Sequence, residues 1–408
     1  MLFRSDLRRV CGRLGGGDLR IQAILIAFCF GGLLAALAGF GAPVAITATM
    51  ILALGVKPLK AAITVLLANT APVAFGAVAV PITTAGDVGG KDAHMIATIV
   101  GHQAPFLAML VPLILLVILD GMKGLKDAWL PALVIGVSFA IAQWITAATP
   151  AYNLTDVVAC IVSMGVAVLF LQFWKPRGVE GVRERYGLPA QSEEKEALPA
   201  VRVWMALLPY LIVVVIFGIA NLHAGLKAWL KSFVLKVDIH ALSSRLVTAN
   251  GKPVKDAVYN FAWMANPGTL LVISGMIVAI VYFFFNEKGR YAFKFPAFFT
   301  VFGSVVYRLR WSILTFASVL ALAYVMNFSG QTIAMGTFLA GLGTVYAFLA
   351  PALGWIGTAV TGSDTSANAL FSKQQVSAAE NLQHAGIHGA TPELMLAANT
   401  TGGVVGKM

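Results

Sequence analysis

Long apolar runs recur along the whole chain, and polar stretches separate them. A helix needs roughly 20 apolar residues to cross about 30 Å of hydrocarbon, and several of these runs reach that length. The pattern therefore predicts an all-α polytopic membrane protein. The expected membrane segments are about 21–38, 43–56, 58–80, 95–119, 128–148, 155–174, 203–221, 268–285, 311–327, 331–361 and 392–405.

The polar stretches define the expected connections. Residues 1–20 carry five arginines and two aspartates and are expected to form a polar N-terminal segment. The stretch 175–202 has six basic and five acidic side chains, which indicates an aqueous, cytoplasmic loop. Residues 222–262 carry six Lys/Arg and predict an extramembrane excursion with an interfacial helix near LHAGLKAWLKSFVLK. Residues 286–310 are expected to form a basic loop.

Composition supports the membrane assignment. The chain is 59% hydrophobic and 12% charged, whereas soluble domains are about 45–50% apolar and about 25% charged. The net charge of +11 lies in the connections, which is typical of loops at an anionic lipid surface and not of a nucleic-acid interface. No P-loop or dinucleotide loop is found. Glu380, His384 and His388 have the i, i+4, i+8 spacing of metal ligands on a helix, but Gly386 and Gly389 argue against a helix of that length. We therefore expect a lipid bilayer as partner, and no nucleic acid, metal or organic cofactor.

One apolar region is interrupted by GFGAPVAIT at 39–47, although no charge lies between Arg20 and Lys57. Glycine and proline would end a helix there. Irregular backbone at membrane depth survives only where protein or a water-filled cavity surrounds it. The freed N–H groups then face the cavity and suit an anion. We interpret the break as part of an anion site.

The same combination occurs twice. LLANTAPVAFGAV (66–78) and MLAANTTGGVVGKM (395–408) both contain Asn-Thr, with a glycine seven residues after the Asn. GFGAP precedes the first and TGSDTSANALF (361–371) precedes the second. Paired interrupted segments mark the binding site of secondary transporters; chance repetition and helix packing by small residues are the alternative explanation. We predict two inverted repeats, at 21–174 and 311–408, joined through segments at 203–285, with a site near the midplane.

Asp364 is the lone acid between Glu287 and Glu380 and lies within TGSDTS. An ionisable residue at membrane depth is a functional candidate, because its burial is costly. The alternative is a helix cap, since Ser363, Asp364 and Thr365 are all good N-cap residues. Both roles are compatible.

The most recognisable stretches of the chain are TGSDTSANALF, GFGAPVAIT and NTAPVAFGA, together with LGWIGTAVTGSDTSANALF and AANTTGGVVGKM. On these stretches the chain resembles the bacterial L-lactate permease family from about residue 21 to 408. The resemblance implies proton-linked uptake of L-lactate and related 2-hydroxymonocarboxylates, such as glycolate, across the bacterial cytoplasmic membrane. It also implies a fold similar to that of transporters that pair re-entrant hairpins with broken helices. The alternatives are a transporter of another small organic anion and a membrane-embedded enzyme.

Three departures accompany the resemblance. The family has further membrane helices before and after the matching region, so we expect the chain to be a fragment. The family also has a glutamate where Ala35 stands and an arginine where His102 stands. Loss of both charges suggests that an ion pair has been exchanged, and His102 and Asp364 become the candidates for proton coupling.

The resemblance and the broken segments together assign a substrate site. Backbone N–H groups around Gly39–Pro43 and Gly362–Thr365 are expected to hold the carboxylate of lactate, with Asn and Thr side chains contacting its hydroxyl group. The predicted substrate-binding residues are Gly39, Phe40, Gly41, Pro43, Asn69, Thr70, Gly362, Ser363, Thr365, Ser366, Asn368, Asn399 and Thr400.

Overall fold

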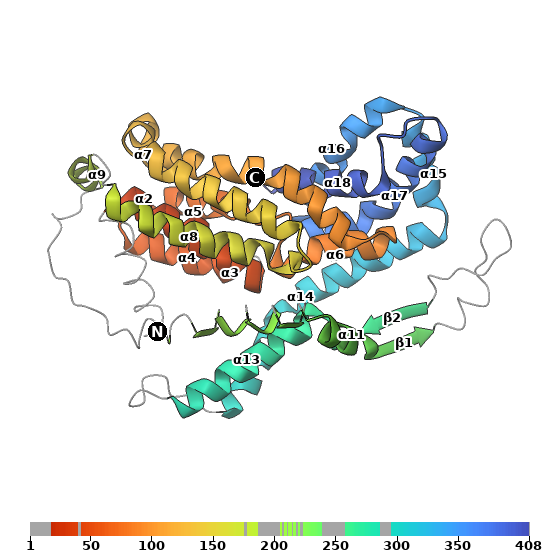
Figure 1. Ribbon diagram of the computed structural model, residues 1–408, viewed down its shortest axis with the longest axis horizontal. Coiled ribbons are helices and arrows are strands. Elements are labelled where there is room, and N and C mark those ends of the chain that lie inside the picture. Colours follow the sequence, from red (N-terminus) through yellow and green to blue (C-terminus); the bar gives the residue numbers. More distant parts are fainter. Residues whose placement is uncertain are drawn as a thin grey trace. The chain divides into compact units, whose positions relative to one another are not determined.

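The computed structural model of the protein is built almost entirely of helices (Figure 1). The chain divides into two compact units: Met1–Ala206 with Leu314–Met408, and Leu207–Ile313. Each unit is described by itself. The structure describes residues 18–39, 42–174, 178–186, 205, 208–209, 211–213, 215–217, 219–220, 223–238, 258–285 and 295–407.

The first unit begins with a buried apolar run made of α2 (Leu19–Ile24), a π-helical turn η1 (Leu25–Phe30) and α3 (Gly31–Ala38). α4 (Ala42–Ala53) and α5 (Pro58–Ala68) follow. The predicted break between α3 and α4 is confirmed. α3 ends at Gly39, whose φ of +74° is a conformation that side chains with a Cβ rarely adopt.

The N-terminal polar segment is shorter than expected. We predicted it at 1–20, but α2 already begins at Leu19, and Arg20 is fully buried. Arg20 forms ion pairs with Asp18 at 2.8 Å and Asp120 at 3.1 Å. These partners offset the cost of removing the guanidinium from water, so a charged residue can be part of the helix.

α7 (Ala93–Ala147) comprises two helical segments, because Gly121 and Ala128 have non-helical backbone angles. This matches the predicted segments at 95–119 and 128–148. α8 (Thr155–Phe173) packs along α7 (Figure 1). The short helix α9 (Val179–Arg185) follows within the connection expected to be aqueous.

The expected single segment at 58–80 is wrong. α5 ends at Ala68, turns occupy the residues from Asn69 to Gly76, and the 3-10 turn η2 (Ala77–Ala79) leads into α6 (Val80–Gly89). Pro72 cannot continue a helix, because it lacks the N–H and its ring clashes with the preceding turn. Val78 and Ala79 both have positive φ, at 51° and 57°, which is costly for residues with a Cβ.

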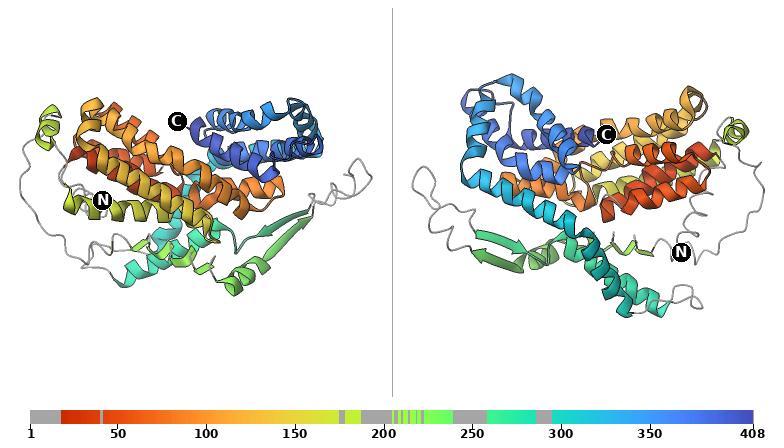
Figure 2. Two further views of the ribbon diagram at one scale, coloured as in Figure 1. Left: turned by 45° about the horizontal axis from the view of Figure 1, so that its top comes forward. Right: turned by 180° about the vertical axis from the view of Figure 1, so that it is seen from behind.

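The C-terminal part of the first unit holds α15 (Gln331–Ala340), α16 (Thr344–Thr361), α17 (Asp364–His384) and α18 (Pro392–Gly406). The single segment predicted at 331–361 is therefore two helices. Gly343 separates them with a φ of +61°. α17 contacts α6, and α18 contacts both α6 and α7, so the C-terminal helices pack against helices from the first half of the chain (Figure 2).

α16 and α18 pack backbone against backbone. A Cβ at Gly354 would collide with the carbonyl of Asn399, and a Cβ at Gly402 would collide with that of Pro351. Small residues at such contacts let membrane helices approach closely, because van der Waals packing and not the hydrophobic effect drives their association in lipid. The glycines of TTGGVVG therefore serve packing.

The basic loop predicted at 286–310 is also corrected. Helix α14 (Phe295–Phe328) covers its second half and contains the boundary between the two units. Only Arg308 and Arg310 are charged between residues 295 and 310, and the other residues there are mostly apolar. The basic residues that motivated the loop are concentrated at 288–294, all of which lie outside the described residues.

The second unit contains α11 (Ala224–Ser232), a pair of antiparallel strands and α13 (Pro267–Phe284). α11 confirms the helix expected in LHAGLKAWLKSFVLK. The strands β1 (Val234–Asp238) and β2 (Val258–Ala262) pair with Val234 opposite Ala262. The hairpin was not predicted, because a single strand pair has too few residues for a clear alternation of apolar and polar positions.

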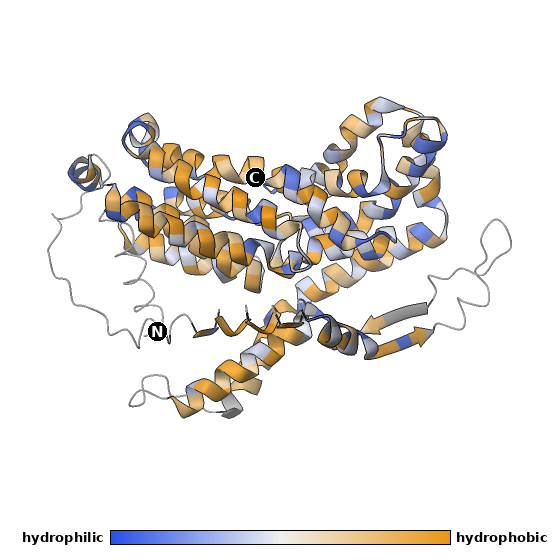
Figure 3. Cartoon of the chain, viewed as in Figure 1, coloured by the Kyte–Doolittle hydropathy of each residue, from blue (hydrophilic) through white to orange (hydrophobic). Residues whose placement is uncertain are grey.

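The outer faces of the helices are apolar (Figure 3). Phe106, Leu169 and Phe348 are among many large apolar side chains that are more than half exposed. A water-soluble surface seldom carries extended apolar areas of this kind, whereas lipid tails cover them. Among the described residues, five helical stretches are long and apolar enough to cross a membrane: Leu19–Leu37, Ala93–Ala147, Tyr152–Phe173, Phe298–Phe328 and Thr344–Thr361.

Candidate functional site

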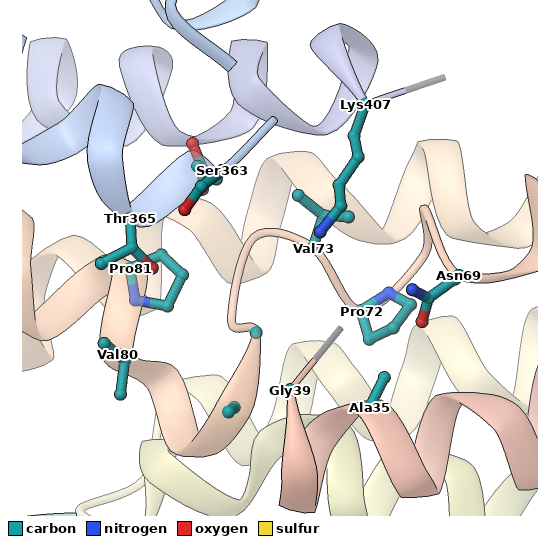
Figure 4. A pocket seen from close by; sticks show the side chains of 13 residues that line it. Ala35, Gly39, Asn69, Pro72, Val73, Val80, Pro81, Ser363, Thr365 and Lys407 are labelled. Carbon is teal, nitrogen blue, oxygen red and sulfur yellow. The ribbon is translucent and has the colours of Figure 1, made fainter. Parts of the chain in front are cut away.

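A pocket of about 210 Å³ lies inside the first unit, where broken helices end (Figure 4). Its volume lies below the range of roughly 300–1,000 Å³ typical of sites for drug-sized ligands, and it suits a small organic acid. Five segments contribute: the end of α3, the turns after α5, the start of α6, the start of α17 and the end of α18. The lining residues are Ala35, Gly39, Asn69, Pro72, Val73, Gly76, Ala77, Val80, Pro81, Ser363, Asp364, Thr365 and Lys407.

Two helix N-termini meet at this pocket. Ser363 caps α17, and its hydroxyl group accepts a hydrogen bond from the Ser366 N–H at 3.3 Å. The N-cap of α6 is Ala79, which offers no side-chain cap. The first N–H groups of a helix have no partner within it and carry partial positive charge. In α6 the Val80 N–H donates to the carbonyl of Ala77 and Pro81 has no N–H, so α6 contributes chiefly the positive end of its dipole, and together with the first N–H groups of α17 it makes this pocket wall favour an anion.

The pocket also contains two opposite charges. Asp364 is 3% exposed, and its Oδ1 accepts a hydrogen bond from the Thr358 hydroxyl group at 3.4 Å. Its Oδ2 has no hydrogen-bond partner among the described residues. Lys407 extends from the end of α18 toward Val73 (Figure 4) and interacts electrostatically with Asp364. Gly403 is required here, because a Cβ would overlap the Asp364 carboxyl group.

The structure brings together part of the predicted site. Gly39, Asn69, Ser363, Asp364 and Thr365 all line the pocket. Phe40 and Gly41 lie outside the described residues. The remaining predicted substrate contacts are described but do not line the pocket: Pro43, Thr70, Gly362, Ser366, Asn368, Asn399 and Thr400.

Three of these residues belong to a buried hydrogen-bond network instead. Asn399 donates to Asn368 Oδ1 at 2.8 Å, and Thr400 donates to the same oxygen at 3.1 Å. Asn368 Nδ2 donates to the carbonyl of Pro81 at 3.3 Å. Since Pro81 lines the pocket, the network positions the start of α6 and affects the pocket indirectly, through Pro81. Gln375 extends the network by donating to Asn399 Oδ1 at 3.3 Å.

Ala35 and His102 lie in different surroundings. Ala35 is buried and lines the pocket, whereas His102 is exposed and does not. The His102 ring packs edge-on against Trp144, and its Nδ1 lies 2.6 Å from the carbonyl of Thr98. The structure thus does not support a pairing of the two positions, and a role of His102 in proton coupling stays a prediction.

The pattern of broken segments did not identify two parts of the site. The first part is Lys407, a cation that lines the pocket. We had expected only neutral groups, namely backbone N–H groups and Asn and Thr side chains, to hold the anion. The signal was present, because Lys407 is the one charged residue in the apolar end of the chain after Glu393. The start of α6 was missed because residues 58–80 were expected to form one helix.

These features define a class: an all-α polytopic membrane protein that encloses a small charged pocket between broken helices, as membrane permeases do. The chain belongs to the L-lactate permease family, whose model matches residues 9–408. The family name points to a transporter and not to an enzyme.

The chain is similar to several bacterial permeases. It is 37% identical to the L-lactate permease of Bacillus subtilis over 414 residues, covering 96% of this chain and 71% of that protein. It is 38% identical over 414 residues to the glycolate permease of Escherichia coli, covering 96% of this chain and 70% of the relative. The L-lactate permease of Salmonella typhimurium is 37% identical over 406 residues, with coverages of 96% and 70%. No solved structure matches the chain.

Proposed function

We propose that this chain is a secondary transporter that takes up L-lactate and related 2-hydroxymonocarboxylates, such as glycolate, across the cytoplasmic membrane of a bacterium, together with a proton. The family and the names of its bacterial members support the substrate class. The observation that carries the proposal is the pocket, in which two helix N-termini and Lys407 surround Asp364. Such a charge distribution suits a small carboxylate.

Each part of lactate has a counterpart in the pocket. The carboxylate is expected at the N-termini of α6 and α17, next to Lys407. Asn69 lines the pocket, and its buried Oδ1 has no hydrogen-bond partner among the described residues, so a small rotation of the side chain would let it accept a hydrogen bond from the 2-hydroxyl group. Pro72 and Val73 offer apolar surface to the methyl group. Recognition of the hydroxyl group distinguishes lactate from propionate, because a site built around that hydrogen bond rejects an acid that lacks it.

Asp364 is the proposed proton carrier. While it is ionised, it balances the charge of Lys407, and a second carboxylate in the pocket is repelled. When a proton binds to its carboxyl group, the pocket gains one positive charge and favours the lactate anion. Release of the proton restores the repulsion and favours release of lactate. A carboxyl group of low exposure also holds a proton more readily than one in water.

The test is transport by the full chain reconstituted in lipid vesicles. We expect labelled L-lactate to accumulate when the outside is acidic, and unlabelled glycolate to compete. Asp364→Asn retains the size and much of the capping ability of the residue but cannot release a proton, so it should abolish accumulation while lactate exchange across the vesicle membrane persists. Glu380→Gln, which changes an exposed acid on the same helix, is the matched control and should accumulate lactate normally.

If Asp364→Asn still concentrates lactate in response to a pH gradient, Asp364 is a helix cap and not the proton carrier. If the unmodified chain moves neither lactate nor glycolate, the proposed substrate class is wrong.

A further inference from the structure

A second buried acid lies outside the pocket, between α7 and α8. Asp156 is in the first turn of α8 and is 2% exposed, and Gln143 on α7 is fully buried. Gln143 Nε2 donates a hydrogen bond to Asp156 Oδ1 at 2.9 Å. This contact ties the second half of α7 to the start of α8, which lie side by side (Figure 1).

The hydrogen bonds of this pair are incomplete. Asp156 Oδ2 and Gln143 Oε1 are both buried and have no hydrogen-bond partner among the described residues. Buried carboxylates are commonly stabilised by two or three donors, whereas Gln143 is the one donor to Asp156 within the described part of the chain. An ionised carboxylate at this place would retain most of the cost of its removal from water. Because both contacting side chains have a buried acceptor oxygen without a donor, a proton bound to one of these two oxygens would satisfy both.

The surroundings provide no compensating cation. Among the described residues, no Lys or Arg forms a hydrogen bond or ion pair with Asp156. The titratable groups facing this region are Cys160 on the next turn of α8, Cys29 on η1, Tyr152 on η3 (Tyr152–Leu154), Asp87 and Asp92 near Tyr152, and His94 on α7, whose ring lies 5.8 Å from that of Tyr152. His94 is the one member of this set that can carry a positive charge, and its Nε2 lies 3.2 Å from the carbonyl oxygen of Ala148 and not at Asp156.

We propose that Asp156 and Gln143 form a proton-binding site. A proton taken from water binds to Asp156 Oδ2, and the resulting O–H group donates to Gln143 Oε1, while Gln143 Nε2 continues to donate to Oδ1. Each side chain then donates once and accepts once, as in the two-sided pairing of a carboxylic acid with an amide, and no buried oxygen of the pair is left without a partner.

The site is connected to the pocket through η2. η3 and the start of α8 contact η2, whose Ala77 lines the pocket and whose Val78 and Ala79 have positive φ. Loss of the proton separates the charged carboxylate from Gln143 Oε1 and loosens the support of this strained turn. Given the transport function proposed above, Asp156 is then a second protonation site that senses pH next to the pocket loop.

Infrared spectroscopy of the full chain in lipid vesicles tests the site without any substrate, so its outcome is independent of whether lactate is transported. A protonated carboxyl group has a carbonyl band that a carboxylate lacks. We expect the band of Asp156 at neutral pH to disappear in Asp156→Asn and to persist in Asp364→Asn. Asp156→Asn retains the shape of the protonated acid and can donate to Gln143 in its place.

Gln143→Leu supplies a second readout, because it leaves the Asp156 carboxyl group in place and removes its partner. The band should then shift to the higher frequency of a carboxyl group without a hydrogen bond. A spectrum that is identical in the unmodified chain and in Asp156→Asn overturns the proposal, and so does an unshifted band in Gln143→Leu.

Discussion

The two Asn-Thr motifs should respond differently to the same substitution. Asn69 lines the pocket, and its Oδ1 is buried and has no hydrogen-bond partner among the described residues. Asn69→Ala therefore removes no existing side-chain hydrogen bond through that oxygen and should leave the stability of the protein nearly unchanged. Bound lactate, however, loses the acceptor for its 2-hydroxyl group. An unsatisfied buried donor costs about 1–3 kcal/mol, which corresponds to an apparent affinity roughly 5- to 150-fold lower.

Asn399→Ala is expected to do the reverse. It removes two hydrogen bonds, to Asn368 Oδ1 at 2.8 Å and from Gln375 Nε2 at 3.3 Å. Both partners retain another hydrogen bond, since Asn368 still accepts from Thr400 and Gln375 still donates to the carbonyl of Ala350. At about 0.5–1.5 kcal/mol for each hydrogen bond, the free energy of unfolding should fall by about 1–3 kcal/mol. The affinity for lactate should change little.

The assay combines two measurements on each variant. The concentration dependence of labelled lactate exchange in vesicles gives the apparent affinity, and thermal unfolding of the detergent-solubilised protein gives the stability. Propionate, which lacks the hydroxyl group, is the control substrate, and Asn69→Ala should reduce the preference for lactate over propionate. Unchanged lactate affinity in Asn69→Ala, or a loss of affinity confined to Asn399→Ala, would refute the assignment of the two residues.

Three further predictions concern Lys407, Arg20 and Gly402. Lys407→Gln should raise the KM for lactate at least tenfold, whereas Lys407→Arg should retain most of the affinity, as measured by vesicle uptake. Equal KM values in the two variants would show that the charge of Lys407 has no role in binding lactate. Arg20→Met leaves buried Asp18 without the cation that it pairs with, whereas Asp120 retains its ion pair with Arg185, and stability should fall by about 3–5 kcal/mol; an unaltered melting temperature would contradict this. Gly402→Ala should abolish folded protein in size-exclusion profiles, whereas Gly165→Ala, at a position with open space around it, should be tolerated.

The sequence predicted the class of the fold and the positions of most helices, because apolar runs of membrane-spanning length are a strong signal. It failed at 58–80 and 331–361, where apolar residues continue across a break. Hydropathy averages over such breaks, and the residues that cause them, Pro72 and Gly343, are common inside membrane helices. The predicted inverted relation of the two repeats stays a prediction.

The site could be predicted only in part, for a related reason. A motif such as TGSDTS shows which residues lie near a helix break, and Ser363, Asp364 and Thr365 indeed line the pocket. It does not show which face of the following helix turns toward the cavity. Asn368 lies one helical turn beyond Asp364 and is committed to Pro81 instead. Lys407 could be placed only once the close packing of α16 and α18 was known.

The contact between α16 and α18 limits how the pocket can open. Interlocked backbones at Gly354 and Gly402 leave no side chains whose rotation could absorb sliding, so the two helices must travel as one rigid piece. The opposite wall is built differently, from turns between Asn69 and Ala79 that hold few regular hydrogen bonds and two strained residues. Alternating exposure of the pocket to the two sides of the membrane would then require the turns between α5 and α6 to move relative to the rigid pair of α16 and α18. The hinge of this movement would lie between α5 and α6.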